Sequence, residues 1–488
     1  MKSWRAPPLL IVACALLCAS CTVGPDFRTP DPPAVDRYVP GSQPDTIGTV
    51  KLVRERDIPA EWWSVFGSAD IDDLVRRAIK ASPTLDQARA RLVEAQELRT
   101  ARAGATQYPQ VDATASAVRQ RIDPATFGFP QAPNPGPFNV YTIGADVSYT
   151  FDLFGGTRRE LEGLAADVDY QGFELEAARL TLATNVVLTA IRQAALAAQI
   201  ESTGDILAAQ RRQLGIVEQR HGLGGVAWLD VQNQRALVAQ TEAVLAPLRA
   251  QWAQAGHLLA VYTGEPPAVA AIPAIRLADL RLPAELPLRV PSELIRQRPD
   301  IRANEALLHK ASANVGVATA DLYPRLSISG AFSTSQLRVS DLFGNGINVW
   351  NFGANLLQPL FHGGELQARK RAAIAAYDQA AAAYRLSVLQ GLQNVADVLR
   401  SLESDDAAFA ARSEQAARAE EAYRITLGRF NAGGVSQLDL LDAQRQRLQA
   451  DSERLQAQAS RYSDAAALFQ ALGGGWTAAP AAPAAAIR

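Results

Sequence analysis

The chain has 488 residues, of which 48% are hydrophobic and 20% are charged, and its formal net charge is −2. This balance offers no strongly basic surface to nucleic acid or to an anionic membrane, so no nucleic-acid partner is expected. The length allows two or three ordinary domains or one repeated architecture.

The first twenty residues predict a signal peptide. Lys2 and Arg5 supply positive charge, and the apolar run Leu9–Ala19 is too short to cross a bilayer. Small residues precede Cys21, as in a bacterial lipobox, so we expect cleavage before Cys21 and a covalent lipid on its thiol. Cys18 stands where that pattern usually has Leu or Val, and ordinary cleavage that leaves Cys21 as a free thiol is the alternative.

The residues around the cleavage site also indicate a compartment. Thr22, rather than Asp, follows Cys21, which resembles sorting to the bacterial outer membrane. Cys14 and Cys18 leave with the signal peptide, so no disulfide is expected. No stretch after Ala19 is apolar for 18 residues, so no transmembrane helix is expected and any membrane crossing must use strands.

The chain is internally duplicated. Gly-Gly-Val at 224–226 recurs at 433–435, an offset of 433 − 224 = 209 residues. Each half reads as helix, strand, loop, strand, very long helix, Gly-Gly-Val turn and long helix. The expected divisions are a signal peptide 1–20, a lipid-anchored extension 21–60, a first repeat 61–264, a connector 265–290, a second repeat 291–473 and a disordered tail 474–488.

Long helices are predicted in both halves. No proline occurs between Phe138 and Ala246, or between Leu360 and Ala479, so helices are free to continue there. Apolar residues recur every seven positions, which is typical of left-handed coiling. The second-half stripe comprises Ile374, Ala381, Val388, Val395, Leu402, Phe409, Ala416, Tyr423 and Phe430. A helix of about 65 residues is about 100 Å long, far longer than a globular core requires.

Four segments predict strands, at about 109–120, 138–152, 324–334 and 347–358. Apolar and small polar residues alternate along them: Tyr141, Ile143 and Val147 share one face, with Thr142 and Asp146 on the other. This alternation is typical of a transmembrane barrel strand. A soluble sandwich with one wet face is the alternative.

Four strands cannot close a barrel with a water-filled lumen, and an open sheet edge is not tolerated in lipid. Each chain must therefore supply part of a barrel, and copies of the chain must complete it. The strands alone predict a homo-oligomer in a membrane.

Over nearly its whole length the chain resembles the TolC-type outer-membrane factors, in particular the lipid-anchored RND-type efflux outer membrane lipoproteins (NodT-type). The resemblance is carried by "CTVGPDF" at 21–27, by "VPSELIRQRPDIRANEALL" at 290–308, and by the order of the duplicated elements. It implies a mixed α and β membrane protein, in which three protomers of four strands each form a twelve-stranded outer-membrane β-barrel. The barrel continues into a long periplasmic α-helical coiled-coil barrel.

The resemblance also implies partner proteins and the positions of the short helices and the turns. Short helices near Ile71–Lys80, near Pro291–Gln297 and around the connector would form a belt midway along the helices. The Gly-Gly-Val turns, Gly222–Ala227 and Asn431–Ser436, would be the periplasmic tips that contact a periplasmic adaptor (membrane fusion) protein. An inner-membrane RND pump would supply the energy. From the residues alone, glycine in these turns supplies a left-handed helix C-cap.

By the same resemblance, the residues of the tips that would contact the adaptor are Gly224, Gly225 and Val226 in the first turn and Gly433, Gly434 and Val435 in the second.

Two aspartates follow the second turn. By resemblance Asp439 and Asp442, and the matching Asp230 of the first repeat, ring the periplasmic gate; a ring of carboxylates favours cations. Spacing alone favours a local role, in which Ser436 is an N-cap and Asp439 completes a capping box. The family's closing network has a tyrosine and an arginine where this chain has Phe430 and Val435, so closure here is expected to rest more on packing.

No catalytic centre or metal site is predicted, and no cofactor beyond the lipid on Cys21. The four histidines, at 221, 257, 309 and 362, do not pair at metal-ligand spacing, and no nucleotide-binding or nucleophile motif has a supporting context.

The leading hypothesis is a passive outer-membrane exit duct for drugs or other small amphiphilic compounds in a tripartite RND-type pump. An exit duct for type I protein secretion is the second hypothesis. A structural coiled-coil lipoprotein, which conducts nothing, is the third.

Overall fold

The computed structural model describes residues 22–40, 45–48, 50–54, 57–344 and 347–476. The predicted signal peptide and Cys21 lie outside these residues. The described elements divide into two compact units. The first holds the described residues up to Thr29 with Leu92–Gln171 and Asn304–Tyr384, and the second holds Pro30–Arg91, Gly172–Ala303 and the described residues from Arg385. The units cut across the two sequence repeats.

The duplication extends to the ends of the helices. Helix α4 (Gly156–Gly222) and helix α8 (Glu365–Asn431) each have 67 residues, and α5 (Trp228–Tyr262) and α9 (Gln437–Ala471) each have 35. Adding 209 to the ends of α4 gives 365 and 431, and adding 209 to the ends of α5 gives 437 and 471, which are the ends of α8 and α9. The two helical hairpins are therefore equal in length, residue for residue.

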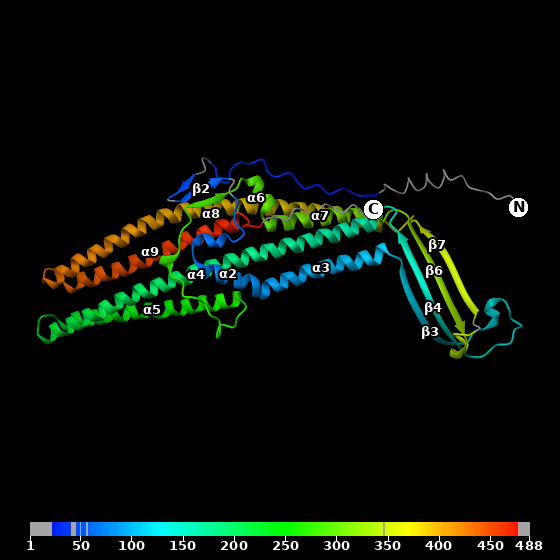
Figure 1. The fold of residues 1–488 in the computed structure, drawn as a ribbon, viewed down its shortest axis with the longest axis horizontal. Helices are drawn as coiled ribbons and strands as arrows, with labels where there is room; N and C mark the ends of the chain where they lie inside the picture. Colours follow the sequence, from blue (N-terminus) through cyan, green and yellow to red (C-terminus); the bar gives the residue numbers. More distant parts are fainter. Residues whose placement is uncertain (1–21, 41–44, 49, 55–56, 345–346, 477–488) are drawn as a thin grey trace. The chain divides into compact units, whose positions relative to one another are not determined.

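The first unit contains one four-stranded antiparallel sheet. Its order is β3-β4-β6-β7, with β3 (Gln110–Gln120), β4 (Phe138–Phe151), β6 (Arg325–Gln336) and β7 (Ile347–Leu357) side by side in Figure 1. The strands lie within about two residues of the expected ranges. Helices α3 (Pro83–Gln107) and α7 (Pro299–Ala320) lead into β3 and β6, and short 3-10 turns, Pro124–Phe127 and Val339–Asp341, lie in the two loops.

The register of the sheet brings most of the large apolar residues of the four strands onto one face, while Val118, Val349 and Leu357 lie on the other. Ala145 is opposite Phe332, and Phe332 is opposite Trp350, so the alternation in each strand joins into one surface. Trp350 and Phe352 are 74% and 72% exposed. The other face is polar, and there Asp112 is directly opposite Asp146. An exposed apolar face of this kind marks a surface that meets lipid or another chain.

The N-terminal strap, residues 22–29, packs on α4 and α7 within the first unit. The Val23 N–H donates to Phe154 O at 3.1 Å, and the buried Arg159 donates to Val23 O and, at 2.6 Å, to Asp26. Phe27 stacks on His309 with ring centroids 4.4 Å apart. Further along, Thr29 Oγ1 donates to Glu305 at 2.8 Å.

The strap is tightly fitted as well as hydrogen-bonded. A Cβ added to Gly24 would lie 2.4 Å from Gly316 Cα, and a Cβ on Gly155 would lie 2.7 Å from the Thr22 side chain. Neither contact tolerates a side chain, so the backbone of the strap is seated against α4 and α7. The first residues after the predicted lipid site are therefore a docked segment, not a loose tether.

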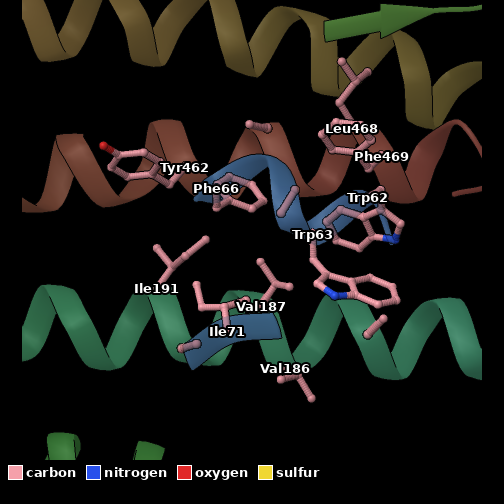
Figure 2. Close-up of a cluster of buried hydrophobic side chains, with 14 of the residues drawn as sticks. Trp62, Trp63, Phe66, Ile71, Val186, Val187, Ile191, Tyr462, Leu468 and Phe469 are labelled. Atoms are coloured by element: carbon pink, nitrogen blue, oxygen red, sulfur yellow. The ribbon is translucent and has the colours of Figure 1, made fainter. Parts of the chain in front are cut away.

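The core of the second unit is apolar and includes a short N-terminal helical region. The 3-10 helix Trp62–Phe66 and α2 (Ala69–Ala81) insert Trp62, Trp63, Phe66 and Ile71 between α4 and α9, as Figure 2 shows. Ser68 caps α2, since the Ile71 N–H donates to Ser68 Oγ at 3.3 Å. Trp62 stacks on Phe469 with centroids 5.3 Å apart.

The connector corrects one expectation. Between α5 and α6 (Pro291–Gln297) the described chain forms a 3-10 turn, Leu277–Asp279, and a strand, β5 (Glu285–Leu288), instead of belt helices. Strand β5 pairs in parallel with β2 (Val50–Arg54), which pairs antiparallel with β1 (Thr46–Ile47). The extension and the connector are thus held together by a small sheet.

Helix α5 continues through Pro247. Two other expectations also change. One window of α4 is long and apolar enough to span a membrane by composition, contrary to expectation, but 67% of that window is buried inside the protein, as in a core helix. The prediction of a disordered tail is wrong for residues 474–476. The Gly474 N–H donates to Phe469 O at 2.8 Å, and the Trp476 ring packs edge-on against Phe173 with ring centroids 5.8 Å apart. The rest of the predicted tail lies outside the described residues.

Candidate functional site

The candidate site is formed by the two turns that join the long helices, both in the second unit. In the first turn (Gly222–Ala227) Gly224 has φ +75°, and in the second turn (Asn431–Ser436) Gly433 has φ +76°. The next glycines close each helix: Gly225 N–H donates to Arg220 O, and Gly434 N–H donates to Arg429 O, both at 2.8 Å. The left-handed C-cap predicted for these glycines is confirmed, and a residue with a Cβ is disfavoured at both positions.

The remaining residues of the predicted tips flank these glycines. Val226 and Val435 are both half-buried, and His221 Nδ1 lies 3.0 Å from Val226 O, which holds the first turn closed.

Asp439 adopts the capping geometry that spacing predicts. Ser436 Oγ and Ser436 N–H donate to Asp439 Oδ2 at 2.6 and 2.9 Å, and Asp439 N–H lies 3.3 Å from Ser436 Oγ. These hydrogen bonds lower the pKa of the exposed Asp439 carboxyl below its ordinary value, so the group carries its charge over the physiological pH range. In the first repeat Asp230 makes the equivalent backbone contact, because it accepts the Ala227 N–H at 3.1 Å.

Asp442 lies one turn beyond Asp439 and differs from it. Its carboxylate pairs with Arg445 on the same helix, and it borders a cavity of about 680 Å³ lined by α4, α5 and α9. Capping does not require Asp442, because it lies past the first turn of α9.

The two hairpins, α4–α5 and α8–α9, meet near the turns through Phe430. The Arg220 guanidinium lies over the Phe430 ring at 5.2 Å, and Phe430 is buried. This cation–π contact connects the end of α4 to the end of α8. The contact requires no hydroxyl group on the Phe430 ring.

A cluster of buried glutamines also lies between the hairpins. Gln437 Nε2 donates to Gln234 Oε1 at 2.8 Å, and Gln234 Nε2 donates to the Gln210 backbone carbonyl at 3.2 Å. Neither side-chain amide atom of Gln210 has a hydrogen-bond partner among the described residues, nor does Gln444 Oε1.

Within each hairpin the two helices are linked by ion pairs. In the first, Arg235 pairs with Glu218 at 2.7 Å and Arg211 with Glu242 at 2.5 Å. In the second, Arg412 pairs with Glu453 at 2.5 Å. Ion pairs thus link the two helices of each hairpin, and the Gln437–Gln234 hydrogen bond and the Arg220–Phe430 contact link one hairpin to the other.

Sequence reasoning identified the turns and their aspartates but missed Arg220 and the glutamines. Arg220 is four residues before Gly224, at a position where a basic residue also favours a helix C-terminus for local reasons. The glutamines are a type usually exposed, so only tertiary contacts reveal their burial. Among the described residues, no group of three or more His, Cys, Asp or Glu is arranged to hold a metal ion.

Comparisons with known proteins place these features in a family. The chain matches the family described as "Outer membrane efflux protein" over residues 74–265 and 290–474. It is 31% identical over 418 residues to the pyoverdine export outer membrane protein OpmQ of Pseudomonas aeruginosa, covering 85% of this chain and 87% of OpmQ. It is 26% identical to the toluene efflux pump outer membrane protein TtgF of Pseudomonas putida, covering 96% of each. A solved structure of the outer-membrane channel OprN superposes with a TM-score of 0.82 at 30% identity, covering 93% of this chain and 100% of that one.

Proposed function

The chain belongs to the outer membrane efflux protein family, and we propose that it is the outer-membrane exit duct of a tripartite RND-type efflux pump. It lies in the bacterial outer membrane and extends into the periplasm. The duct is passive, and it releases drugs and other small amphiphilic compounds outward.

The observation that carries this proposal is the exposed apolar face of the β3-β4-β6-β7 sheet. Its other face is polar, as expected for a wall between lipid and a water-filled lumen. Strands β3 and β7 each pair on one side only within the described residues. Because open edges are not tolerated in lipid, copies of the chain close the sheet into one barrel. Three copies would give twelve strands.

The cargo class is supported by the relatives. Their names state the export of pyoverdine by one and of toluene by the other, both small molecules. The polar inner face of the sheet, with Ser327, Ser329 and Asn355, offers hydrogen bonds from small side chains, which suits a duct of low selectivity.

The helical turns support the gate and the partners. We place Asp439, Asp442 and Asp230 at a constricted periplasmic entrance, where symmetry multiplies their negative charge. The turns themselves contact a periplasmic adaptor, which connects the duct to an inner-membrane RND pump. A lipid on Cys21 anchors each chain, and the docked strap that follows it supports an anchor held close to the protein.

The gate is tested by the conductance of purified wild-type protein and of Asp439→Ala/Asp442→Ala in planar bilayers. We expect cation-selective channels in the wild type and a several-fold larger conductance or a loss of cation selectivity in the variant. Loss of the carboxylates removes both charge and capping, so Ser436→Ala is the control: it removes the hydroxyl that caps α9 and keeps both carboxylates.

The possible results distinguish a gating role of the aspartates from a capping role, and a duct from a structural lipoprotein. If Ser436→Ala has the same conductance and selectivity as the double variant, Asp439 acts only as a helix-capping residue. If the conductance and selectivity of the double variant equal those of the wild type, the proposed duct stands and the proposed gate is wrong. Folded oligomers that conduct nothing would contradict the duct and favour a structural lipoprotein.

A further inference from the structure

The apolar face of the four-stranded sheet differs at its two ends. Strands β3 and β6 begin where α3 and α7 end, so the loops that follow β3 and β6 lie at the opposite end of the sheet (Figure 1). Because the helices extend into the periplasm, this loop end is the end nearer the cell exterior. The residues at the loop end of the apolar face therefore meet the outer leaflet of the membrane.

The apolar band on this face has a height close to that of a membrane core. Along β4 it extends from Phe151 to Ile143, and 151 − 143 = 8 residues span roughly 27 Å along a strand. At a tilt of about 40° the band is about 20 Å tall, and the apolar band of a transmembrane barrel is about 25 Å tall. Residues that lie beyond Ile143 on the same face are therefore at the level of the lipid headgroups.

Beyond Ile143 the same face becomes polar. Tyr141 is opposite Gln336, and Asn139 is opposite Arg119. Arg119 is exposed, and its Nη1 donates to Asn139 Oδ1 at 3.5 Å, while Asn139 Nδ2 donates to Tyr141 Oη at 3.3 Å. A guanidinium has five N–H donors, so this contact orients the group and leaves donors for a ligand.

The position of Arg119 along the strand suits a headgroup contact. Its partner Asn139 lies 143 − 139 = 4 residues beyond Ile143, or roughly 13 Å further along β4. An arginine on the lipid face is costly at the membrane midplane and costs little near the headgroups. Closure of the barrel through the edge of β3 would use backbone groups, so the Arg119 side chain would stay on the lipid face.

The arginines near the two ends of the sheet differ in their ion pairs. At the helical end three arginines pair with carboxylates, in the pairs Arg102–Glu160, Arg158–Asp152 and Arg325–Asp321. At the loop end Arg119, Arg121 and Arg338 form no ion pair with a carboxylate that the structure describes. The positive charge at the loop end is therefore available to an anion from outside the chain.

The acidic groups of the loops are engaged locally. Asp123 accepts the Ala125 N–H at 3.1 Å, and Asp341 accepts the Ser340 hydroxyl at 2.9 Å. Neither carboxylate pairs with one of the three arginines of the loop end in the part of the chain that the structure describes.

We propose that the loop end of the apolar face, through Arg119 with Asn139 and Tyr141, binds the phosphate of a phosphorylated glycolipid in the outer leaflet. A guanidinium binds phosphate through two parallel hydrogen bonds. The side-chain amides of Asn139 and Gln336 offer hydrogen bonds to sugar hydroxyls. The apolar band packs against the acyl chains of the same lipid, so a headgroup joined to acyl chains fits this surface better than free phosphate.

The test measures the affinity of the purified trimer, in neutral detergent, for lipid A that carries its phosphates and for the same lipid after dephosphorylation. The wild type is expected to bind the phosphorylated lipid about tenfold more tightly, since a hydrogen bond to a charged group contributes at least that much. Arg119→Gln is expected to remove this preference. Arg119→Lys, which keeps the charge and loses the two-pronged geometry, is expected to weaken binding about threefold.

Arg325→Gln is the matched control. Arg325 lies on the other face at the helical end and pairs with Asp321, so its loss is expected to change the affinity less than about twofold. Equal affinity of the wild type for the two lipids would overturn the proposal, and so would equal losses in Arg119→Gln and Arg325→Gln.

The yield of heat-modifiable trimer without added lipid A is measured for every variant. Equal yields, together with weaker lipid binding by Arg119→Gln alone, support the proposal. A lower yield for Arg119→Gln would overturn it, because Arg119 would then contact a second copy of the chain. The inference rests on the proposed barrel, and failure of the barrel would appear separately, as a wild type that forms no trimer and conducts nothing in bilayers without lipid A.

Discussion

At the scale of single residues, the surroundings of two aspartates in the second unit shift their pKa values in opposite directions. Hydrogen bonds from Ser436 lower the pKa of Asp439 and keep it charged. Asp464 on α9 has the opposite environment: burial first, then the charge of Asp405 and a hydrogen bond with it, raise its pKa to about 7. The neighbouring Asp406 pairs with Arg461, so the Arg461 guanidinium is engaged by Asp406 rather than by Asp464.

This pair makes stability depend on pH in a defined direction. The folded protein holds the Asp464 proton more tightly than the unfolded chain, so the contribution is fully present below the unfolded pKa and is lost as pH rises through about 7. Asp464→Asn, which mimics the protonated group, is expected to be more stable than wild type at pH 8, by on the order of 1 kcal/mol after allowing for partial exposure, and equal to it near pH 4. Thermal unfolding across this pH range measures the difference.

The exposed Asp378 on α8 provides the control for that measurement. Asp378→Asn should leave the pH dependence of the melting temperature as it is in wild type. A pH profile of Asp464→Asn that runs parallel to that of the wild type would contradict the contribution of Asp464 to the pH dependence of stability.

At the scale of elements, local patterns were the most predictable. The heptad stripe and the absence of proline predicted α8, and alternation predicted the four long strands, because each signal lies within one segment. The sheet of β1, β2 and β5 was not predictable: strands of two to five residues carry little alternation, and Leu52 pairs with Leu286, more than 200 residues away. Burial of Gln210 and Gln437 was missed for the same reason, since it is decided by neighbours distant in sequence.

The strap is the element whose role is easiest to isolate. Arg159→Ala removes the donor to Val23 and Asp26, so residues 22–29 are expected to detach from α4 and α7, with a loss of about 1–3 kcal/mol in stability. Faster tryptic cleavage after Arg28 would report the detachment. The neighbouring Arg158, which is half exposed and pairs with Asp152 instead, is the control. Equal cleavage rates in Arg159→Ala, Arg158→Ala and wild type would count against a docked strap.

At the scale of the whole molecule, the faces of the sheet decide how the chain meets the membrane. Phe352 and Asn351 are adjacent in β7 and lie on opposite faces. Phe352→Arg is expected to prevent membrane insertion or trimer formation, because arginine on the lipid face costs about 2–4 kcal/mol near the midplane in each copy. Asn351→Arg should insert normally and reduce cation selectivity. The yield of heat-modifiable trimer in outer membranes compares the two, and equal yields would contradict the assignment of the faces.

The equal lengths of the two hairpins have a consequence for how such a chain can change over generations. Deleting one residue from α4 would retract the first turn by about 1.5 Å and rotate it by about 100° relative to the second. That rotation would carry Arg220 away from Phe430 and Gln234 away from Gln437. Substitutions can accumulate singly, but insertions and deletions in these helices must arise in compensating sets. The contacts between the two hairpins therefore constrain the helices of each hairpin to keep the same length as those of the other.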